Sequence, residues 1–282
     1  MTCIVVVNPA SGSVPENAVD LIDTELAHLS ISYDIQTVSS DTLQDTLSRA
    51  HETLSANDTL AIWSGDGSLA CALELQRDNS PPILALPGGT MNMLHKRIHG
   101  DVTDWPAVLK NCLENRNELE LASGLISGHR FYVGALFGKL TQLARAREIG
   151  RQGQPLKAVG EVLNTTDLLD LTPELVITSE DGNEFQANTM GVFVEDTVPD
   201  AFEAGIFSSI SMLDLTTAAL EALFMDWRIA DGVDHIITRT LNVSCDTDHP
   251  IHVTLDGEPY DLECPLKLEF QPRSARVLTA RQ

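Results

Sequence analysis

Residues 59–69 read TLAIWSGDGSL, in which a short apolar run leads directly into a turn with two glycines. An uninterrupted apolar run of this length is typical of a strand that is buried on both faces of a parallel sheet. The same pattern occurs at CIVVVN (3–8), which PASG follows, and at ILAL (83–86), which PGGT follows. Strand, glycine turn and helix in repeated order predict an α/β fold in which helices cover a parallel sheet.

The other elements of the first half follow from the spacing of its apolar residues. SYDIQTV (32–38) is expected to form a further strand. Helical spacing is expected over 16–29, 41–54 and 68–77, with another helix from about residue 90. We therefore expect an α/β domain over residues 1–118.

Short strand-like segments dominate the rest of the chain. We expect residues 119–265 to form a β-rich domain, a sandwich or an open barrel, with a hairpin at Asp181–Gly182. Two helical segments, about 139–150 and 156–170, interrupt the strands, and ISMLDL (210–215) is one of the strands. The closing segment, 266–282, is expected to return to the first domain.

The composition restricts the class of protein. The chain has 282 residues, 43% of them hydrophobic, and a formal charge of -23 from 41 acidic and 18 basic side chains. So acidic a chain is not expected to bind nucleic acid, which needs Lys and Arg to neutralise phosphates. No apolar segment approaches the roughly 20 residues of a membrane-spanning helix, and we expect a cytoplasmic protein. The five cysteines are widely spaced, so we expect small buried side chains and neither disulfides nor a zinc site.

Two basic segments stand out against this acidic background. Residues 121–160 contain six basic side chains and one acid, and Arg273, Arg276 and Arg281 close the chain with no acid among them. Within the first segment, the stretch 139–157 is expected either to engage phosphate groups or anionic lipid headgroups, or to be an ordinary exposed helix. The first alternative predicts transient, salt-sensitive contact with membranes.

The three glycine turns are candidates for phosphate binding. Ligands of open α/β sheets bind at the carboxyl ends of the strands, where each of these turns is expected. Glycines let backbone N–H groups approach a phosphate, and the helices that follow add favourable dipoles, so three such turns suit a nucleoside triphosphate. There is no Walker-type lysine motif and no dinucleotide fingerprint. A metal ion and basic residues elsewhere must therefore offset the phosphate charge, and Asp66 is placed to help hold the metal.

Four motifs then occur in order along the chain. They are N-P-x-S-G from Asn8, S-G-D-G-S-L from Ser64, L-P-G-G-T-x-N-x-L from Leu86, and LDGEPYDLECPLKLEFQPRSARVL over 255–278. Together they resemble the diacylglycerol kinase catalytic domain family, which includes bacterial lipid kinases and sphingosine kinases. The resemblance implies an NAD-kinase-like nucleotide domain, a β-sandwich-like lipid domain, ATP between the two, and Mg²⁺. It implies a kinase that transfers the γ-phosphate of ATP to a hydroxyl of a diacylglycerol, a sphingoid or a related lipid alcohol.

The resemblance also implies roles for individual residues. The positions that correspond to nucleotide contacts are Asn8, Pro9, Ala10, Ser11, Gly12, Thr37, Gly65, Asp66, Gly67, Ser68, Gly89, Thr90 and Asn92. The catalytic base is expected to be Glu258, Asp256 or Asp66, and Asp66 is also the candidate magnesium ligand. Without the resemblance, Asp256-Gly257 would be interpreted as a hairpin turn.

The chain departs from the family pattern at two places. Met93 follows Asn92 where many members have an acid, and PDAFEAG (199–205) offers Glu203 and Ala204 where some bacterial members bind a structural Mg²⁺ with two acids. We therefore expect that second metal site to be absent. The departures at Met93 and Ala204 keep open an inactive nucleotide-binding regulator as an alternative. The G-D-G turn, which is shared with kinases of soluble nucleotides, keeps open a kinase of a nucleotide such as NAD. The sequence does not decide whether the chain forms a homodimer.

Overall fold

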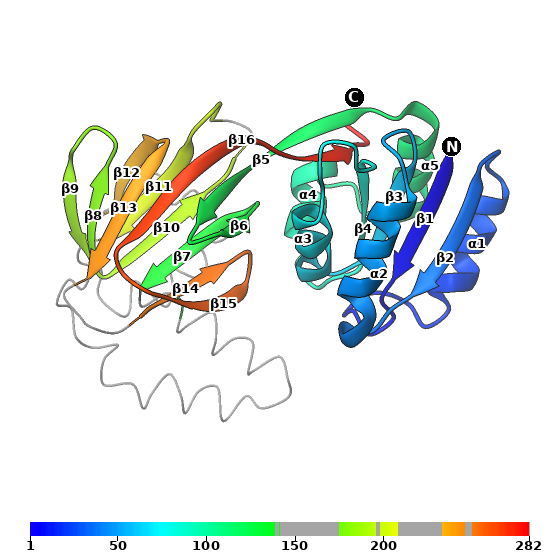
Figure 1. Ribbon diagram of the computed structural model, residues 1–282, viewed down its shortest axis with the longest axis horizontal. Coiled ribbons are helices and arrows are strands. Elements are labelled where there is room, and N and C mark those ends of the chain that lie inside the picture. The colour runs from blue at the N-terminus through cyan, green and yellow to red at the C-terminus, as the bar shows by residue number, and fades with distance from the viewer. Residues whose placement is uncertain (139–140, 142–174, 196–197, 208–232, 246–249, 282) are drawn as a thin grey trace. The chain divides into compact units, whose positions relative to one another are not determined.

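The computed structural model describes residues 1–138, 141, 175–195, 198–207, 233–245 and 250–281. The chain divides into two compact units (Figure 1). Unit 1 comprises Met1–Ala122 and Pro272–Gln282, and unit 2 comprises Ser123–Gln271. The helices expected at 139–150 and 156–170 and the strand expected at 210–215 lie outside the described residues.

Unit 1 contains the parallel sheet that the sequence predicts. Its strands lie side by side in the order β2, β1, β3, β4, and all three pairings are parallel (Figure 1). The strands are β1 (Thr2–Val7), β2 (Ser32–Thr37), β3 (Thr59–Ser64) and β4 (Ile83–Pro87). Every residue of β3 is buried, which explains why its sequence is continuously apolar up to Ser64.

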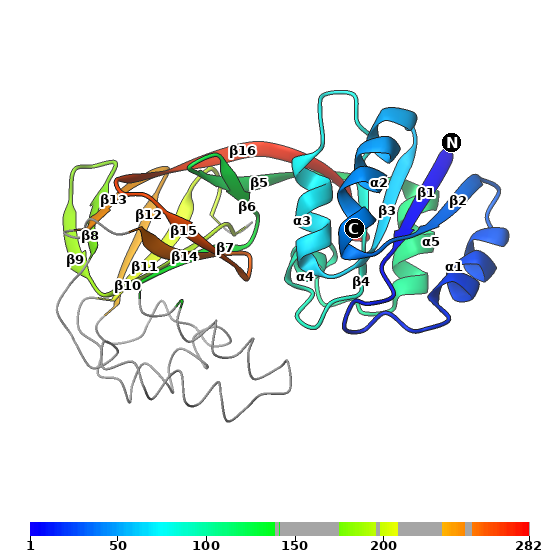
Figure 2. The ribbon, with the colours of Figure 1, turned by 60° about the horizontal axis from the view of Figure 1, so that its bottom comes forward.

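Helices cover both faces of this sheet (Figure 2). α1 (Ala18–Ala27) and α5 (Trp105–Asn115) pack on one face, where their apolar residues share a core with alternate residues of β1 and β3. Trp63 and Trp105 meet there, with ring centroids 4.3 Å apart. α2 (Ser40–Thr53) and α3 (Asp66–Glu74) contact each other on the opposite face, and the short α4 (Met93–His99) contacts β4.

Two helices begin at different residues from those expected. α3 begins at Asp66, two residues before the predicted start, because Gly65 has extended backbone dihedrals and serves as the N-cap. α4 begins only at Met93, because Asn92 adopts a left-handed conformation with φ 51°. Asparagine tolerates this conformation better than most residues. Both starts are therefore set by the turns that precede them.

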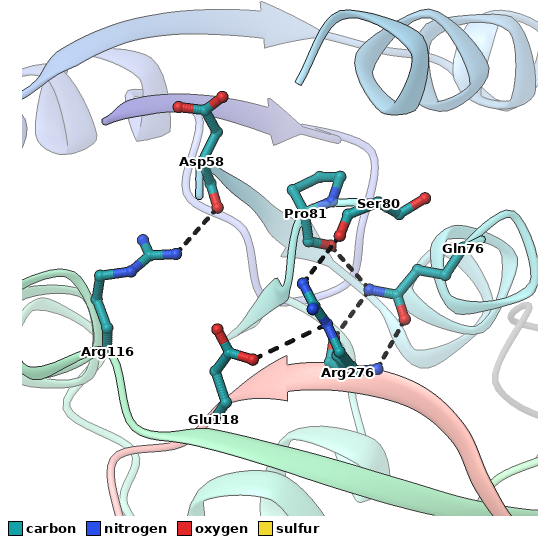
Figure 3. A network of polar contacts seen from close by, with 7 residues as sticks. All are labelled: Asp58, Gln76, Ser80, Pro81, Arg116, Glu118 and Arg276. Atoms are coloured by element: carbon teal, nitrogen blue, oxygen red, sulfur yellow. Dashed lines mark hydrogen bonds and ion pairs between the residues drawn. The ribbon is translucent and has the colours of Figure 1, made fainter. Parts of the chain in front are cut away.

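The end of the chain completes unit 1. β16 (Leu266–Leu278) runs from unit 2 into unit 1, where Val277 pairs in parallel with Ile83 of β4. Figure 3 shows how Gln76 holds it: the side-chain amide donates to the carbonyls of Pro81 and Arg276, and its oxygen accepts the Arg276 N–H. The Arg276 guanidinium donates to the Ser80 carbonyl at 3.0 Å. Backbone and side-chain bonds together fix this strand in unit 1.

The described residues of unit 2 form two antiparallel sheets. In the first, β16 is followed by β13 (Thr240–Cys245), β8 (Leu175–Ser179) and β9 (Glu184–Ala187), while β5 (Glu118–Ile126) pairs with β16 and β6 (His129–Phe131). In the second, the order is β12 (Val233–Thr238), β11 (Phe202–Phe207), β10 (Thr189–Phe193), β7 (Gly134–Gly138), β14 (Ile251–Leu255) and β15 (Glu258–Leu262).

Aromatic side chains join the two sheets into a sandwich. Phe202 of the second sheet stacks on Phe131 of the first, with centroids 5.9 Å apart, and meets Phe270 of β16 edge-on at 5.5 Å. The hairpin expected at Asp181–Gly182 connects β8 and β9, and Gly182 has the positive φ of 81° that such a turn requires. The prediction of an α/β domain followed by a sandwich is confirmed.

The cysteines only partly follow the prediction. Cys3 and Cys112 are buried, as expected, whereas Cys71, Cys245 and Cys264 are half-buried. Burial raises the pKa of Cys3 and of Cys112 to about 12, so these two thiols stay protonated at neutral pH. The expectation of uniformly buried cysteines is therefore wrong.

Candidate functional site

The three glycine turns meet at one edge of the unit 1 sheet. β1, β3 and β4 are neighbours, and the register pairs Val7 with Trp63 and Ser64 with Pro87. The turns that begin at Asn8, Gly65 and Gly88 therefore leave the sheet side by side. Thr37 lies beside the first turn, because it pairs with Val7 at the end of β2, and its side chain is exposed.

Serine hydroxyls connect the first two turns. The Ser11 hydroxyl lies 2.9 Å from the Ser64 hydroxyl and accepts the Gly65 N–H at 3.1 Å. The Ser64 hydroxyl in turn donates to the Ser68 hydroxyl at 2.7 Å. Ser64 is buried, and it is absent from the residues that the sequence assigns to the site. The available signal was a polar residue at the end of a fully apolar strand.

The third turn is bonded to the first. Ser13, which the sequence assignment also omits, donates its N–H to the Gly88 carbonyl at 3.0 Å and its hydroxyl to the Gly89 carbonyl at 2.8 Å. The side-chain oxygen of Asn92 accepts the Gly89 N–H at 2.7 Å. The three turns thus form one hydrogen-bonded network, which places their exposed groups in fixed positions.

Close backbone approach explains the two glycines of the third turn. A Cβ on Gly88 would lie 2.8 Å from Ser64 Cα and 2.7 Å from a methyl carbon of Val14. A Cβ on Gly89 would lie 2.9 Å from Gly65 Cα. Contacts this short are repulsive, since carbon atoms pack at about 3.5–4.0 Å. No residue with a side chain fits at either position without moving a neighbouring turn.

Asp66 fastens the second turn to the third. Its carboxylate oxygens accept the N–H groups of Met93 and Leu94 at 3.0 and 3.1 Å. These N–H groups belong to the first turn of α4, where a helix has no internal acceptor for them. The carboxylate that the sequence assigns to metal binding or catalysis therefore also anchors a helix, and its remaining lone pairs are what another ligand would use.

The exposed part of the three turns consists mainly of backbone. Pro9, Ala10, Gly12, Gly67 and Thr90 are exposed. Among the described residues, no side chain caps the N-terminus of α3, so the N–H groups of its first turn remain for another acceptor. Backbone N–H groups beside exposed glycines suit an anion. The geometry fits a phosphate chain lying across the turns.

Behind the third turn, α4 places two histidines against β4. His99 accepts the Ala280 N–H with Nδ1 at 3.1 Å, so its Nε2 carries the proton and donates to the Ala85 carbonyl at 3.0 Å. His95 Nδ1 lies 3.1 Å from the same carbonyl. Burial, reinforced by the neighbouring His95, lowers the pKa of His99 to about 3.

The other two candidate carboxylates belong to unit 2. Asp256 and Gly257 form the two-residue turn between β14 and β15, with φ values of 48° and 95°. The Asp256 carboxylate accepts the N–H groups of Tyr132, Val133 and Gly134 at 2.6–2.9 Å. Glu258, the first residue of β15, is exposed. Asp256 therefore ties the hairpin to the β6–β7 connection, and Glu258 is the more accessible carboxylate.

Residues 199–205, where the sequence predicts that the family's second metal site is absent, contain a buried acid. Glu203 on β11 is 3% exposed, and its carboxylate lies 2.8 Å from Nε2 of His235 on β12. Within the described ranges, no group of three or more His, Cys, Asp or Glu side chains is arranged to hold a metal ion.

The basic residues at the end of the chain have partners within unit 1. Arg273 forms an ion pair with Glu120 at 3.0 Å, and Arg276 lies 3.9 Å from a carboxylate oxygen of Glu118. Arg281 donates to the carbonyls of Lys96 and Arg97 near the end of α4. In the basic segment 121–160, Arg130 is described and exposed, and its other five basic side chains lie outside the described residues.

Comparison with known proteins agrees with these motifs. Residues 2–123 match the family model of the diacylglycerol kinase catalytic domain. A crystal structure of a diacylglycerol kinase from Bacillus anthracis str. Sterne superposes with a TM-score of 0.68 at 13% identity, over 98% of this chain and 96% of that chain. A second crystal structure from the same organism gives 0.68 at 16% identity, over 98% and 96%.

At these identities the superpositions establish the fold, and no curated protein sequence matches the chain. In the described part of the chain, no helix is both long enough and apolar enough to cross a bilayer. The family assignment therefore depends on the match of the N-terminal residues and on the motifs that they contain. Residues 2–123 of this chain match the model of the diacylglycerol kinase catalytic domain family.

Proposed function

We propose that the protein is an ATP-dependent, Mg²⁺-requiring kinase that phosphorylates a hydroxyl of a lipid alcohol, of the diacylglycerol, sphingoid or a related class. The observation that carries the proposal is the bonded set of three glycine turns in a domain that matches the model of the diacylglycerol kinase catalytic domain family. Phosphoryl transfer asks mainly for positioning and charge stabilisation, and rigid backbone turns supply positioning.

The residues of unit 1 fit this role. ATP supplies the phosphoryl group, and Mg²⁺ offsets the negative charge on it. We propose that the first-turn N–H groups of α3, the exposed backbone around Gly12 and the Thr90 hydroxyl bind the phosphates. Asp66 would hold the metal through the lone pairs that Met93 and Leu94 leave free. One carboxylate suffices, because Mg²⁺ bound with a nucleotide takes most of its ligands from phosphates and water.

We propose Glu258 as the general base and Asp256 as a positioning residue. Three backbone N–H groups already occupy the Asp256 carboxylate, whereas Glu258 is exposed on the same hairpin. A base must come within hydrogen-bond reach of the acceptor hydroxyl, and an accessible side chain can do so. The Glu258→Gln variant keeps the size of the side chain and removes its basicity, so kcat is expected to fall about 10²–10⁴-fold.

The test is an assay of ADP release with ATP, Mg²⁺ and separate acceptors: diacylglycerol, a sphingoid base, a prenol and NAD. Glu263→Gln, on another exposed residue of the same region, is the matched control. Phosphorylated lipid that depends on Glu258 but not on Glu263 supports the proposal. NADP formation would instead identify a nucleotide kinase. Tight ATP binding without turnover, unchanged in Glu258→Gln, would identify an inactive regulator.

We further propose that the protein is cytoplasmic and contacts anionic membranes transiently through the basic segment 121–160. The excess of positive charge in that segment supports this. Co-sedimentation with vesicles of anionic phospholipid should weaken as salt rises, and Arg145→Gln, Arg147→Gln and Arg151→Gln together should abolish it. Binding that is indifferent to both changes would contradict the proposal. The same preparation, run on a sizing column with light scattering, reports whether the chain is a homodimer.

A further inference from the structure

Two thiols of unit 2 face each other across neighbouring strands. Cys245 ends β13, and Cys264 lies two residues before β16, with their sulfur atoms 3.1 Å apart. The antiparallel register pairs Leu241 with Leu268 and Val243 with Leu266. Continued by two residues, it sets Cys245 directly opposite Cys264. Residues directly opposite in an antiparallel pair point their side chains to the same face of the sheet.

The surroundings of the pair differ from those of the cysteines in the unit 1 core. Cys245 and Cys264 are both half-buried, so a small molecule in solution can reach them, whereas Cys3 and Cys112 are fully buried. The strands also hold the pair in place, because the β13–β16 ladder begins at Val243 and Leu266, next to the two thiols. Proximity is therefore built into the sheet and does not depend on a chance encounter.

We propose that Cys245 and Cys264 are a redox modification site, at which a small disulfide such as oxidised glutathione converts the two thiols into a reversible intramolecular disulfide. The thiolate of one cysteine attacks oxidised glutathione and releases one glutathione thiolate, leaving a mixed disulfide. The second cysteine loses its proton and attacks the protein sulfur of that mixed disulfide, which releases the second glutathione. Two protein thiols are oxidised and one glutathione disulfide is reduced to two thiols, so atoms and electrons balance.

The bond would enclose the segment that carries the Asp256 turn. Residues 246–263 lie between the two cysteines and include β14 and β15. A disulfide restricts the conformations open to the chain that it encloses. We expect slower amide exchange in the β14–β15 hairpin of the oxidised protein. In a cytoplasmic protein, disulfides are mostly transient and regulatory, and this site makes the hairpin the element that responds.

The rate of the reaction should depend on pH. Burial, together with the neighbouring Cys245, raises the pKa of Cys264 to about 12. Thiol–disulfide exchange proceeds through the thiolate, so oxidation should be slow at neutral pH. Between pH 7 and pH 8 the thiolate fraction rises about tenfold, and the rate of ring closure should rise with it.

The test uses the full chain and oxidised glutathione as the probe. After equilibration at pH 8 and trapping of free thiols, peptide mass spectrometry should find one linked peptide pair containing Cys245 and Cys264, which dithiothreitol separates. Cys71→Ser is the control, because it removes the other half-buried thiol, and it should give the same linked pair. In Cys264→Ser, Cys245 should instead retain one glutathione.

Three results would overturn the inference. The first is that Cys245 and Cys264 remain separately alkylated in the wild type. The second is that both carry glutathione without linking to each other. The third is that a linked pair forms but exchange of the hairpin amides is unchanged, which removes the proposed effect on the hairpin. The wild-type mapping needs no substitution, so it stays decisive even if a serine variant fails to fold. None of these measurements depends on kinase activity.

Discussion

The contact between Gly89 and Gly65 allows a sharp test of the bonded turns. In Gly89→Ala, the added Cβ would lie 2.9 Å from Gly65 Cα and 3.3 Å from the Asn92 side-chain oxygen. Carbon atoms pack at about 3.5–4.0 Å, so the second and third turns must separate by roughly 0.6–1.1 Å. Both neighbours are held by hydrogen bonds, Gly65 through Ser11 and Asn92 through Gly89 itself. The strain therefore falls on the geometry that binds phosphate.

Both stability and rate should respond to this strain. Overpacking of a well-packed region costs about 1–3 kcal/mol, and a misplacement of about 1 Å in a catalytic geometry costs up to about 100-fold in rate. We expect Gly89→Ala to lower the free energy of unfolding by about 1–3 kcal/mol. The value of kcat/KM for ATP should fall about 10–100-fold. Urea unfolding can be followed by tryptophan fluorescence, because the indole of Trp63, one of three tryptophans in the chain, donates to the Pro87 carbonyl beside this turn.

Gly65→Ala is the matched control, since it approaches the same contact from the other side. Its Cβ would lie 3.5 Å from Gly89 Cα and 3.9 Å from the Ser11 hydroxyl, both ordinary contacts. Its φ of -78° and ψ of 172° are accessible to alanine. Its free energy of unfolding should change by less than about 1 kcal/mol, because most substitutions that disturb no contact have small effects. Equal destabilisation by the two variants would refute the argument from close approach.

Three further predictions concern residues that stabilise one unit or the other: His99 and Gln76 in unit 1, and Asp256 in unit 2. His99, with its pKa near 3 in the folded state and about 6.5 when unfolded, takes up a proton on unfolding between these values, so stability should fall below pH 6.5. The loss due to His99 should be about 2 kcal/mol at pH 5 and absent from His99→Gln, as urea titrations of both proteins at pH 7.5 and 5.0 would show. Asp256→Asn keeps a residue that tolerates positive φ but weakens three charged hydrogen bonds. The free energy of unfolding of unit 2, measured with heat or urea, should therefore fall by about 2–3 kcal/mol. The control Asp261→Asn, on the same hairpin, should not show this loss. Gln76→Ala removes three hydrogen bonds to the Pro81 and Arg276 backbone (Figure 3). It should therefore destabilise unit 1 by about 2–3 kcal/mol and expose the C-terminal segment to limited proteolysis. Unchanged cleavage would contradict the role given to Gln76.

The sequence predicts the edge of the sheet well, because its signals there are local. A continuously apolar run before a glycine turn indicates a buried parallel strand, and neighbouring strand ends must share an edge of the sheet. The bonds that join the turns are not local. Ser11 and Ser64 are 53 residues apart, and Ser13 and Gly89 are 76 residues apart. The polar end of an apolar strand singles out Ser64 but does not indicate its partner, and no local pattern singles out Ser13.

The β-rich half shows the same limit in another form. Alternation and the Asp-Gly turn predict one hairpin and most of the described strands, though not β11, since both signals lie within a few residues. The division between the units is harder to locate, because β5 and β16 each run through it. A strand that belongs to two cores keeps its strand pattern across the boundary. The strand pattern therefore does not mark the boundary between the units.

The arginines at the end of the chain show why local charge is an uncertain guide to function. Arg273, Arg276 and Arg281 form a segment without acids in the sequence, yet Glu120, Glu118 and the carbonyl groups at the end of α4 lie beside them in the folded protein. The neutralising groups come from residues more than 150 positions away in the chain, so no window of sequence contains both partners. The guanidinium groups of Arg276 and Arg281 donate hydrogen bonds to backbone carbonyls. Binding to a negative ligand would have to break these bonds and leave the carbonyls without their donors. The same holds for the segment 121–160, in which one acid lies among six basic side chains. Acids from elsewhere in the chain can offset that charge too, so the vesicle assay, not the count of charges, tests our proposal that the segment binds anionic lipid.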